Sequence, residues 1–353
     1  MGMSKKPSEA TPAEVGVTVS QGQSTPTAPP RPIATADDIV VSIIIVTYEG
    51  MDLLERCLQA IRLSKISVPY EVIIVDNGSK SWDRERVLRL FPNAHLIENS
   101  KNGYYARANN QGIEIARGIF LLLLNSDAFL GRHTLEQMLE FMKAHPRAAA
   151  VGPTLVFPDG SQQSEGGRFP NWVDTVVVRS WLPRLLPRSI SVKWFPWYWW
   201  KTTQHHLVDW VTGACWLLRT ETVQQMGGLY EGFQFYGEEA DWCFRAKKRG
   251  YEIWHVATDP VVHLIGGSTN RDLRSIGAKS AAILWVRTKG RLNGVLYELT
   301  SIIDMGCLSV KNAILLRCAS QRIRTQAREQ ANRIGWHIPT HWRTLLYLLR
   351  RQK

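Results

Sequence analysis

Three runs of aliphatic and β-branched residues constrain the fold of this 353-residue chain most strongly. They span residues 39–48 (IVVSIIIVTY), 70–79 (YEVIIVDNGS) and 119–127 (IFLLLLNSD). Such near-continuous runs are typical of strands that are buried on both faces of a parallel sheet. Helical spacing of apolar residues fills segments between them, for example residues 53–61 and 105–117. The alternation predicts an α/β fold with a mostly parallel, doubly wound central sheet.

Polar residues follow these runs, at the place where an open α/β sheet binds its ligands. The first predicted strand closes with Thr47-Tyr48-Glu49, and the second closes with Asp76. A carboxylate at Asp76 is placed to accept a hydrogen bond from the N3–H of a uracil or thymine ring, or from a ribose hydroxyl. Asp76-Asn77-Gly78 is also a common turn sequence, and taken alone the turn is the favoured interpretation.

Asp127 follows the run of four leucines, in the sequence Asn125-Ser126-Asp127, and therefore leaves the core at the same edge of the predicted sheet. A carboxylate there suits a divalent cation, Mg²⁺ or Mn²⁺, that neutralises a diphosphate leaving group. Asp127 is equally suited to cap a helix predicted at residues 132–145. The sequence alone does not decide between these two roles.

Three acidic residues, Glu238, Glu239 and Asp241, lie within four positions, just before a helix predicted at residues 242–249. The positive end of a helix dipole keeps carboxylates ionised, and an ionised carboxylate in a cleft can take the proton of an attacking hydroxyl. The alternative is a structural acidic cap that pairs with Arg245.

His263 ends another predicted strand, PVVH, and is followed closely by Gly266-Gly267-Ser268. Imidazole binds Mn²⁺-like ions, and a Gly-Gly-Ser turn leaves backbone N–H groups for phosphate. A single histidine at a strand end is more often structural, so this signal is weak by itself.

Eight segments follow one another between Val40 and Thr269: VSIIIVTY, VDNGS, NNQG, LLLLNSD, VTGACWLLRTET, GGLYEGF, YGEEADWCFRAKKRG and HLIGGS. Their order resembles that of the family 2 glycosyltransferases, and it is most similar to the rhamnosyltransferase-like branch that builds bacterial surface polysaccharides. The resemblance implies a GT-A fold, which is Rossmann-like with a mostly parallel central sheet. It also implies that a sugar is transferred with inversion from a nucleoside diphosphate.

The same resemblance assigns a role to each candidate residue. The residues that contact the nucleotide are Thr47, Tyr48, Glu49, Asp76, Asn102 and Ser126. Asp127 holds the metal, and His263 faces the metal or the pyrophosphate. The acceptor side is bordered by Gly213, Ala214 and Cys215. Glu239 takes the place of the catalytic base, with Glu238 and Asp241 as alternatives.

The chain departs from the family pattern at several points. The base position holds glutamate where aspartate is commoner, so the carboxylate reaches one methylene further. In the segment Asn102-Gly103-Tyr104-Tyr105-Ala106, a tyrosine stands where the family usually has glycine. The chain also lacks the QxxRW sequence of processive synthases, so we expect one sugar to be transferred per visit.

The basic charge of the chain is concentrated near the C-terminus. From Arg271 onward lie 16 of the 43 Lys and Arg residues but only 4 of the 31 Asp and Glu residues, which accounts for the whole net charge of +12. Basic residues alternate there with Leu, Ile and Trp, and four tryptophans fall between Trp194 and Trp200. This combination favours an anionic membrane surface over nucleic acid as the partner. The alternative is that these aromatics pack in the core or in an oligomer interface.

These features divide the chain into three parts: a disordered N-terminal arm (1–38), a GT-A catalytic domain (39–270) with a Trp-rich insertion at about 170–205, and a basic, amphipathic, membrane-associating helical region (271–353). Since no uninterrupted apolar run of about 18 residues is present, we expect no spanning helix. Five scattered cysteines without a CxxC pair, and an N-terminus without an apolar stretch, indicate a cytoplasmic protein.

The resemblance implies transfer of rhamnose from dTDP-rhamnose to a polyprenyl-diphosphate-linked saccharide in cell-surface polysaccharide synthesis, and with the basic C-terminal region it predicts a place at the inner face of the cell membrane. One alternative is a sugar nucleotidyltransferase, which needs a glycine-rich basic loop that TYEGMDLLERC lacks. The other is a catalytically inactive relative that binds nucleotide sugars. Nothing in the sequence indicates an oligomeric state.

Overall fold

The computed structural model describes residues 39–164, 166–169, 171–172, 175, 204–264, 273–318, 321, 328 and 339–349. The arm predicted at residues 1–38, most of the Trp-rich insertion and the Gly266-Gly267-Ser268 turn lie outside these residues.

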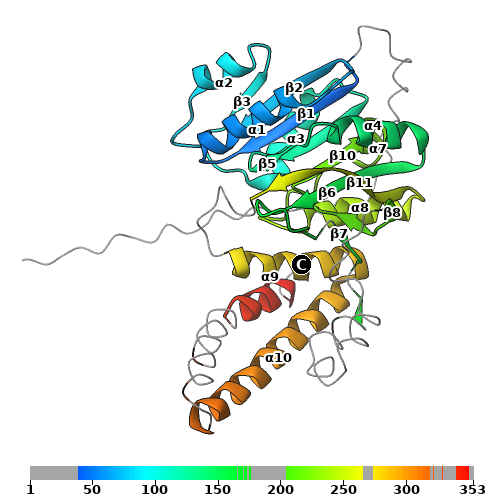
Figure 1. The fold of residues 1–353 in the computed structure, drawn as a ribbon. Helices are drawn as coiled ribbons and strands as arrows, with labels where there is room; N and C mark the ends of the chain where they lie inside the picture. The colour runs from blue at the N-terminus through cyan, green and yellow to red at the C-terminus, as the bar shows by residue number, and fades with distance from the viewer. Residues whose placement is uncertain are drawn as a thin grey trace, which may run out of the picture. The chain divides into compact units, whose positions relative to one another are not determined.

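A nine-stranded sheet forms the centre of the described chain (Figure 1). Neighbouring strands follow the order β3-β2-β1-β4-β10-β6-β11-β5, and β8 pairs with β11. The sheet consists of β1 (Val41–Thr47), β2 (Tyr70–Asp76), β3 (His95–Glu98), β4 (Phe120–Asn125), β5 (Ala128–Phe129), β6 (Ala148–Val156), β8 (His206–Leu207), β10 (Cys215–Arg219) and β11 (Glu252–His263). Strand β1 pairs in parallel with β2 and β4, whereas β10 runs antiparallel between β4 and β6. The predicted α/β fold class is confirmed.

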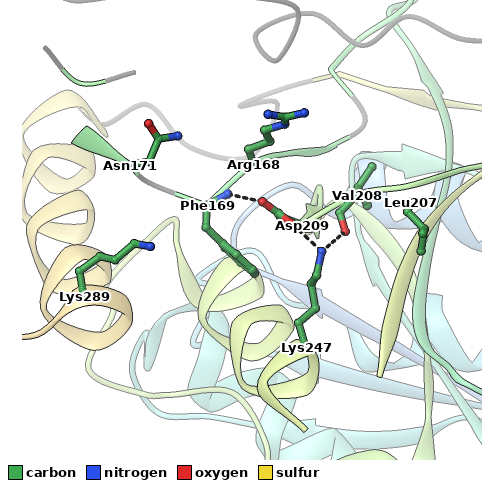
Figure 2. A pocket seen from close by; sticks show the side chains of 8 residues that line it. All are labelled: Arg168, Phe169, Asn171, Leu207, Val208, Asp209, Lys247 and Lys289. Carbon is green, nitrogen blue, oxygen red and sulfur yellow. Dashed lines mark hydrogen bonds and ion pairs between the residues drawn. The ribbon is translucent and has the colours of Figure 1, made fainter. Parts of the chain in front are cut away.

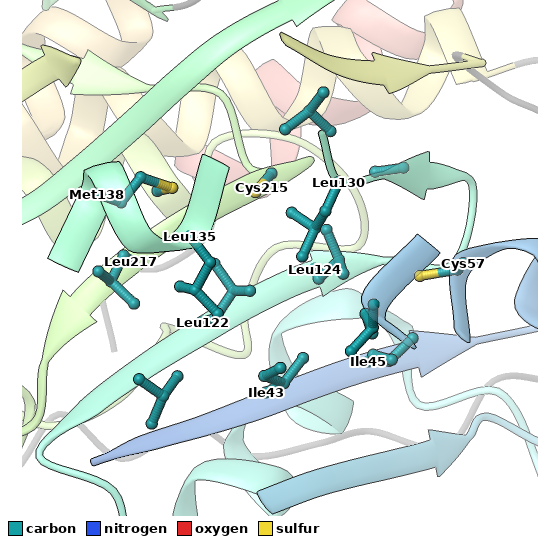
Figure 3. Packing of buried hydrophobic residues seen from close by; sticks show 14 of the residues in the cluster. Ile43, Ile45, Cys57, Leu122, Leu124, Leu130, Leu135, Met138, Cys215 and Leu217 are labelled. Atoms are coloured by element: carbon teal, nitrogen blue, oxygen red, sulfur yellow. The ribbon is translucent and has the colours of Figure 1, made fainter. Parts of the chain in front are cut away.

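Helices cover both faces of the sheet because successive residues of each central strand point to opposite sides. Ile43 and Ile45 of β1 join the cluster that contains the buried residues of α1 and α4, whereas Ile44 joins the cluster that contains those of α3, α7 and α8. Figure 3 shows the first cluster, in which Leu135 and Met138 of α4 lie over the sheet. The helices are α1 (Met51–Leu63), α2 (Arg84–Leu90), α3 (Tyr104–Ile115), α4 (Thr134–Ala144), α7 (Thr220–Met226) and α8 (Glu238–Lys248).

The C-terminal part of the described chain is helical, as predicted. It contains α9 (Leu273–Lys289) and α10 (Arg291–Cys318), and residues 339–349 are also helical. This last segment packs on α10, where His341 Nδ1 lies 2.7 Å from Glu298 Oε2. A small apolar cluster that includes Trp285, Tyr297 and Leu348 joins the three helical segments.

Helix α10 corrects the expectation that no segment is able to span a membrane. Residues Arg291–Arg317 are long enough and apolar enough to cross a bilayer by length and composition, and only 11% of the apolar window is buried. The helix does not contain one uninterrupted apolar run, because isolated polar residues such as Asn293 and Asp304 divide it into shorter apolar stretches.

Candidate active site

The carboxyl ends of β1, β2 and β4 meet at one edge of the sheet. Thr47 pairs with Asp76, and Asn125 lies at the end of β4 beside β1. Strand β5 then places Ala128 opposite His263, at the end of β11. Thr47, Asp76, Asp127 and His263 are therefore brought to this edge from four separate segments, and Ser126 is buried with them.

Asp76 forms the turn that the Asp-Asn-Gly sequence predicts. Both of its carboxylate oxygens accept from the backbone N–H of Ser79 at 3.2 Å, and Gly78 has a φ of +83°. The turn and a nucleotide contact are compatible, because each carboxylate oxygen can accept more than one hydrogen bond.

Glu49 joins the loops that follow β1 and β2. Its carboxylate accepts from Lys80 N and from Ser81 Oγ, both at 3.0 Å, and its own backbone N–H donates to Ser79 Oγ at 2.8 Å. These hydrogen bonds, the one from Lys80 N first, lower the pKa of Glu49. Glu49 therefore holds the two loops together and fixes the turn in which Tyr48 lies.

An asparagine network supports the next loop. Asn102 Oδ1 accepts from Asn77 Nδ2 at 3.0 Å and from Tyr104 N at 2.8 Å, and Gly103 N donates to Asn77 Oδ1 at 2.9 Å. Tyr104, which the resemblance places where glycine is expected, has a φ of +66° in the left-handed region. This conformation costs an L-residue roughly 1 kcal/mol. The network therefore holds a strained residue at the start of α3.

Asp127 and His263 face each other at the sheet edge, with 3.6 Å between Asp127 Oδ1 and His263 Nε2. Gln163 Nε2 donates to His263 O at 2.6 Å and to Val156 O at 3.1 Å, so Gln163 Oε1 accepts from His263 Nδ1 at 3.0 Å. This network assigns the ring proton to Nδ1 and directs the Nε2 lone pair toward Asp127. A nitrogen lone pair beside a carboxylate oxygen is a suitable donor pair for a divalent cation.

Two further observations bear on Asp127. Helix α4 begins at Thr134 with His133 at its N-cap, so the alternative role of Asp127 as the cap of this helix is wrong. Within the described ranges, no three His, Cys, Asp or Glu side chains gather to hold a metal by themselves. A cation at Asp127 and His263 would take its remaining ligands from a substrate and water, as Mg²⁺ commonly does.

Glu239 lies in the first turn of α8 and lines a cavity of about 500 Å³. Trp210, Trp285 and Tyr297 are among the other residues that line this cavity. Burial raises the pKa of Glu239. Aromatic walls with a few polar groups are typical of sites that bind small molecules, and Glu239 is placed to meet an occupant of this cavity.

The other two acids of the cluster do not line this cavity. Glu238 is buried, and its pKa is raised to about 8 by burial and by the charge of Glu239. The two neighbouring carboxyl groups therefore disfavour a second negative charge beside the first. Asp241 is occupied by Arg245 Nε and by Arg287 Nη2, each at 3.1 Å from its carboxylate. Helix α8 begins at Glu238, so the three acids lie inside its first turn rather than before it.

The residues predicted to border the acceptor differ in their surroundings. A Cβ added to Gly213 would lie 3.7 Å from Glu239 Cδ, which places Gly213 beside the base candidate. Ala214 is buried, and its carbonyl accepts from Asn125 N at 2.9 Å. Cys215 is buried in the core, where burial raises the pKa of its thiol. This segment therefore connects Glu239 to the end of β4, two residues before Asp127.

Comparison with known proteins agrees with this geometry. Residues 42–205 match the family model described as glycosyl transferase family 2. The N-acetylglucosaminyl-diphospho-decaprenol L-rhamnosyltransferase of Mycobacterium tuberculosis is 26% identical over 309 residues, which cover 81% of this chain and 95% of that protein. Glycosyltransferase AglE of Haloferax volcanii is 36% identical over 221 residues, or 60% of this chain and 63% of AglE.

The fold is also found among solved structures. The mannosyltransferase PcManGT from Pyrobaculum calidifontis, solved in complex with GDP-Man and Mn²⁺, has a TM-score of 0.52 at 16% sequence identity. The likeness covers 87% of each chain. At this level of identity the comparison concerns the fold, and it supports the GT-A architecture.

Proposed function

We propose a specific reaction for this chain, which is a glycosyltransferase of family 2 and belongs to the rhamnosyltransferase-like branch. It transfers rhamnose, with inversion, from dTDP-rhamnose to a hydroxyl of a saccharide that is linked through diphosphate to a polyprenol, in the synthesis of cell-surface polysaccharide. The observation that carries the proposal is that the candidate metal ligands and the candidate base lie near the same edge of the sheet. The Asp127–His263 pair lies just past the end of β4. Glu239 of α8 lies beside Gly213, which belongs to the segment that leads into β10, the neighbour of β4.

The relatives support the finer parts of this proposal. The mycobacterial protein is named for transfer of L-rhamnose to N-acetylglucosaminyl-diphospho-decaprenol. Its similarity extends over most of both chains, which includes the segments that carry Asp127, Glu239 and His263.

Glu239 acts as the general base in this reaction. Its carboxylate takes the proton of the acceptor hydroxyl while the hydroxyl oxygen bonds to the anomeric carbon. The bond between the anomeric carbon and the diphosphate oxygen breaks on the opposite face, and the nucleoside diphosphate leaves with the bonding electrons. A pKa raised by burial makes the carboxylate a stronger base than an exposed glutamate, provided that it stays ionised at the working pH.

Asp127 and His263 would hold the divalent cation, Mg²⁺ or Mn²⁺, and Gln163 keeps the His263 ring in the tautomer that binding requires. A cation bound there neutralises charge on the departing diphosphate. Asp76 is buried at the end of β2, on the side of β1 opposite β4, where a nucleoside is expected to lie.

A peripheral position on the inner face of the membrane fits the exposed side of α10. Six exposed apolar residues recur there at intervals of three, four or seven positions, which places them on one helix face: Leu292, Leu296, Leu299, Ile303, Val310 and Ile314. The excess of basic residues in the same part of the chain adds attraction to anionic lipid.

Nucleotide release from a panel of sugar nucleotides tests the proposal. With dTDP-rhamnose and a polyprenyl-diphosphate-linked saccharide that can accept rhamnose, the wild-type protein should release dTDP. Asp127→Asn should lose the metal-dependent part of this activity. Full wild-type activity in EDTA would exclude the metal assignment. A nucleotidyltransferase would instead release pyrophosphate from dTTP and a sugar phosphate, and an inactive relative would bind sugar nucleotides without turning them over.

A further inference from the structure

Tyr236 combines two unusual features in the wall of the cavity that contains Glu239. It directly precedes Gly237, the N-cap residue of α8. Tyr236 is 46% exposed, although folding usually buries most of a large aromatic side chain. Its φ of +69° lies in the left-handed region, where a bulky L-residue is an outlier. An exposed ring and a strained backbone therefore occur together at one position of the cavity wall.

The surroundings of Tyr236 hold this strained conformation. Ser280 Oγ of α9 donates to Phe235 O at 2.7 Å, which ties the preceding residue to the neighbouring helix. The rings of Phe235 and Tyr236 contact each other at right angles, with their centroids 4.8 Å apart. Gly277 of α9 backs the Tyr236 ring, since a Cβ at this glycine would lie 3.8 Å from Tyr236 Cδ2. Strained residues persist only where their neighbours fix them, and they cluster at binding sites.

Another part of the cavity wall is also fixed. Phe169 lines both this cavity and a second pocket beside it (Figure 2). The Asp209 carboxylate accepts from Phe169 N at 2.9 Å and from Lys247 Nζ of α8 at 2.5 Å, as dashed lines in Figure 2 show. The ring of Phe169 packs edge-on with that of Phe244, at 5.2 Å between centroids. Tyr236 therefore lines a space whose walls are held by contacts within the protein, as in a preformed binding site.

We propose that Tyr236 stacks against a sugar ring of the acceptor, an inference that rests on the proposed function. One face of a pyranose ring presents several C–H groups, which carry partial positive charge and match the negative face of an aromatic ring. Burial, and next the charges of Glu239 and Glu238, raise the pKa of Tyr236, so the tyrosine and the proposed base share one local environment. A sugar on Tyr236 is therefore held beside Glu239, where the acceptor hydroxyl has to lie.

The surroundings favour the acceptor sugar over the other parts of the two substrates. Neither Asp127 nor His263 is among the described residues that line this cavity, so the donor diphosphate is proposed to bind elsewhere. Glu239 and Ser280 line it together with aromatic residues, and such polar groups suit sugar hydroxyls better than a hydrocarbon chain. Burying an aromatic ring does not require a strained backbone, whereas presenting the ring to a ligand accounts for one.

Titration calorimetry on the full-length protein tests the proposal with three probes: N-acetylglucosaminyl diphosphate esterified with a geranyl chain, geranyl diphosphate without the sugar, and dTDP. Tyr236→Gly removes the ring and adopts a positive φ without strain. It should raise the Kd of the sugar-bearing probe about tenfold, as expected for the loss of one aromatic contact. The Kd values of geranyl diphosphate and of dTDP should not change.

Two further variants show whether the ring itself is responsible. Tyr236→Phe keeps the ring and should keep most of the affinity for the sugar-bearing probe. Tyr236→Asn lacks the ring, but asparagine tolerates the left-handed region. It should therefore weaken binding as Tyr236→Gly does, and it repeats the test if the glycine variant does not fold.

Tyr104→Gly provides the matched control. Tyr104 has a similar φ of +66°, and it is not among the described residues that line the cavity. This variant relieves the same kind of strain and should leave the Kd of the sugar-bearing probe unchanged. An equal loss of affinity in Tyr104→Gly would refute the assignment to Tyr236.

The inference is also overturned if the wild type does not bind the sugar-bearing probe more tightly than geranyl diphosphate, or if Tyr236→Gly and Tyr236→Asn bind it as the wild type does. A loss in Tyr236→Phe as large as in Tyr236→Gly would assign the effect to the hydroxyl and refute stacking. A rise in the Kd of dTDP instead would identify a nucleoside contact and refute the acceptor assignment. A wild-type protein that shows the expected binding pattern but releases no nucleotide from any sugar nucleotide would support the role of Tyr236 and refute the proposed function.

Discussion

Replacing Glu239 with glutamine removes the proton acceptor and keeps the shape of the side chain. Of the three clustered acids, Glu239 is the one on the cavity wall, Glu238 is buried beside it, and Asp241 is bound by two arginines. No second carboxylate of the cluster is positioned to replace it. We therefore expect kcat to fall by about 10²–10⁴-fold, the range for loss of a general base. This equals about 3–5 kcal/mol in the activation barrier.

The assay is the initial rate of dTDP release at saturating donor and acceptor, with nucleotide affinity measured separately. Affinity for dTDP should stay near the wild-type value, because Glu239 lies beside Gly213, which we propose borders the acceptor rather than the nucleotide. Activity of the wild type should fall as pH decreases through the pKa of Glu239, since protonation removes the base, and this acid limb should be absent from the residual activity of Glu239→Gln. A variant that keeps wild-type turnover would refute the assignment. Greater damage from Glu238→Gln than from Glu239→Gln would transfer the role to Glu238.

Three other perturbations follow from the same structure. Glu238 has a pKa of about 8 in the folded protein and an ordinary value of 4.5. The folded state therefore binds more protons than the unfolded state between these values, so stability falls as pH rises through this window. Glu238→Gln should reduce the fall in Tm measured from about pH 5 to pH 8. Gly112→Ala places a Cβ 2.5 Å from Ile44 Cγ2, and should cost about 1–3 kcal/mol in chemical denaturation, whereas Ala at Gly306, where no described atom lies within 4 Å, lacks such a clash. The full-length protein should sediment with anionic vesicles and be released by high salt; retention in high salt would instead favour insertion of α10, and no binding at low salt would refute membrane association.

The strands could be predicted because their signal is local. Continuous apolar runs specify β1, β2 and β4 without reference to the rest of the chain, and parallel pairing then brings Asp76 and Asp127 to one edge of the sheet. The turn at Asp76 is equally local, since its Ser79 partner lies three residues away. The order of the motifs along the chain is also readable from the sequence, and it indicates the family resemblance.

The parts that could not be predicted depend on partners far apart in the sequence. Gln163 sets the tautomer of His263 across 100 residues, and no local pattern marks a glutamine in a polar turn for that task. Tyr105 donates to Gly213 O at 2.7 Å across 108 residues and thereby fixes the segment beside Glu239. Asn77 looks like an ordinary turn residue until its contact with Asn102 is seen. The spanning length of α10 does not show as one continuous apolar run, because polar residues interrupt its apolar ones.

Helix α8 carries both the proposed base, Glu239, and a residue that contacts the C-terminal helices, Asp241. Glu239 and Asp241 are two residues apart in its first turn, yet Glu239 lines the cavity and Asp241 binds Arg287 of α9. Asp241 is almost fully buried, so after loss of Arg287 its negative charge would be paired with Arg245 alone. Removing one partner of a buried ion pair is strongly destabilising. The ion pair therefore fixes α9, which forms part of the cavity wall, relative to Glu239, the proposed base. If α10 lies on the membrane as proposed, the same contact sets the direction from which a lipid-linked acceptor reaches Glu239.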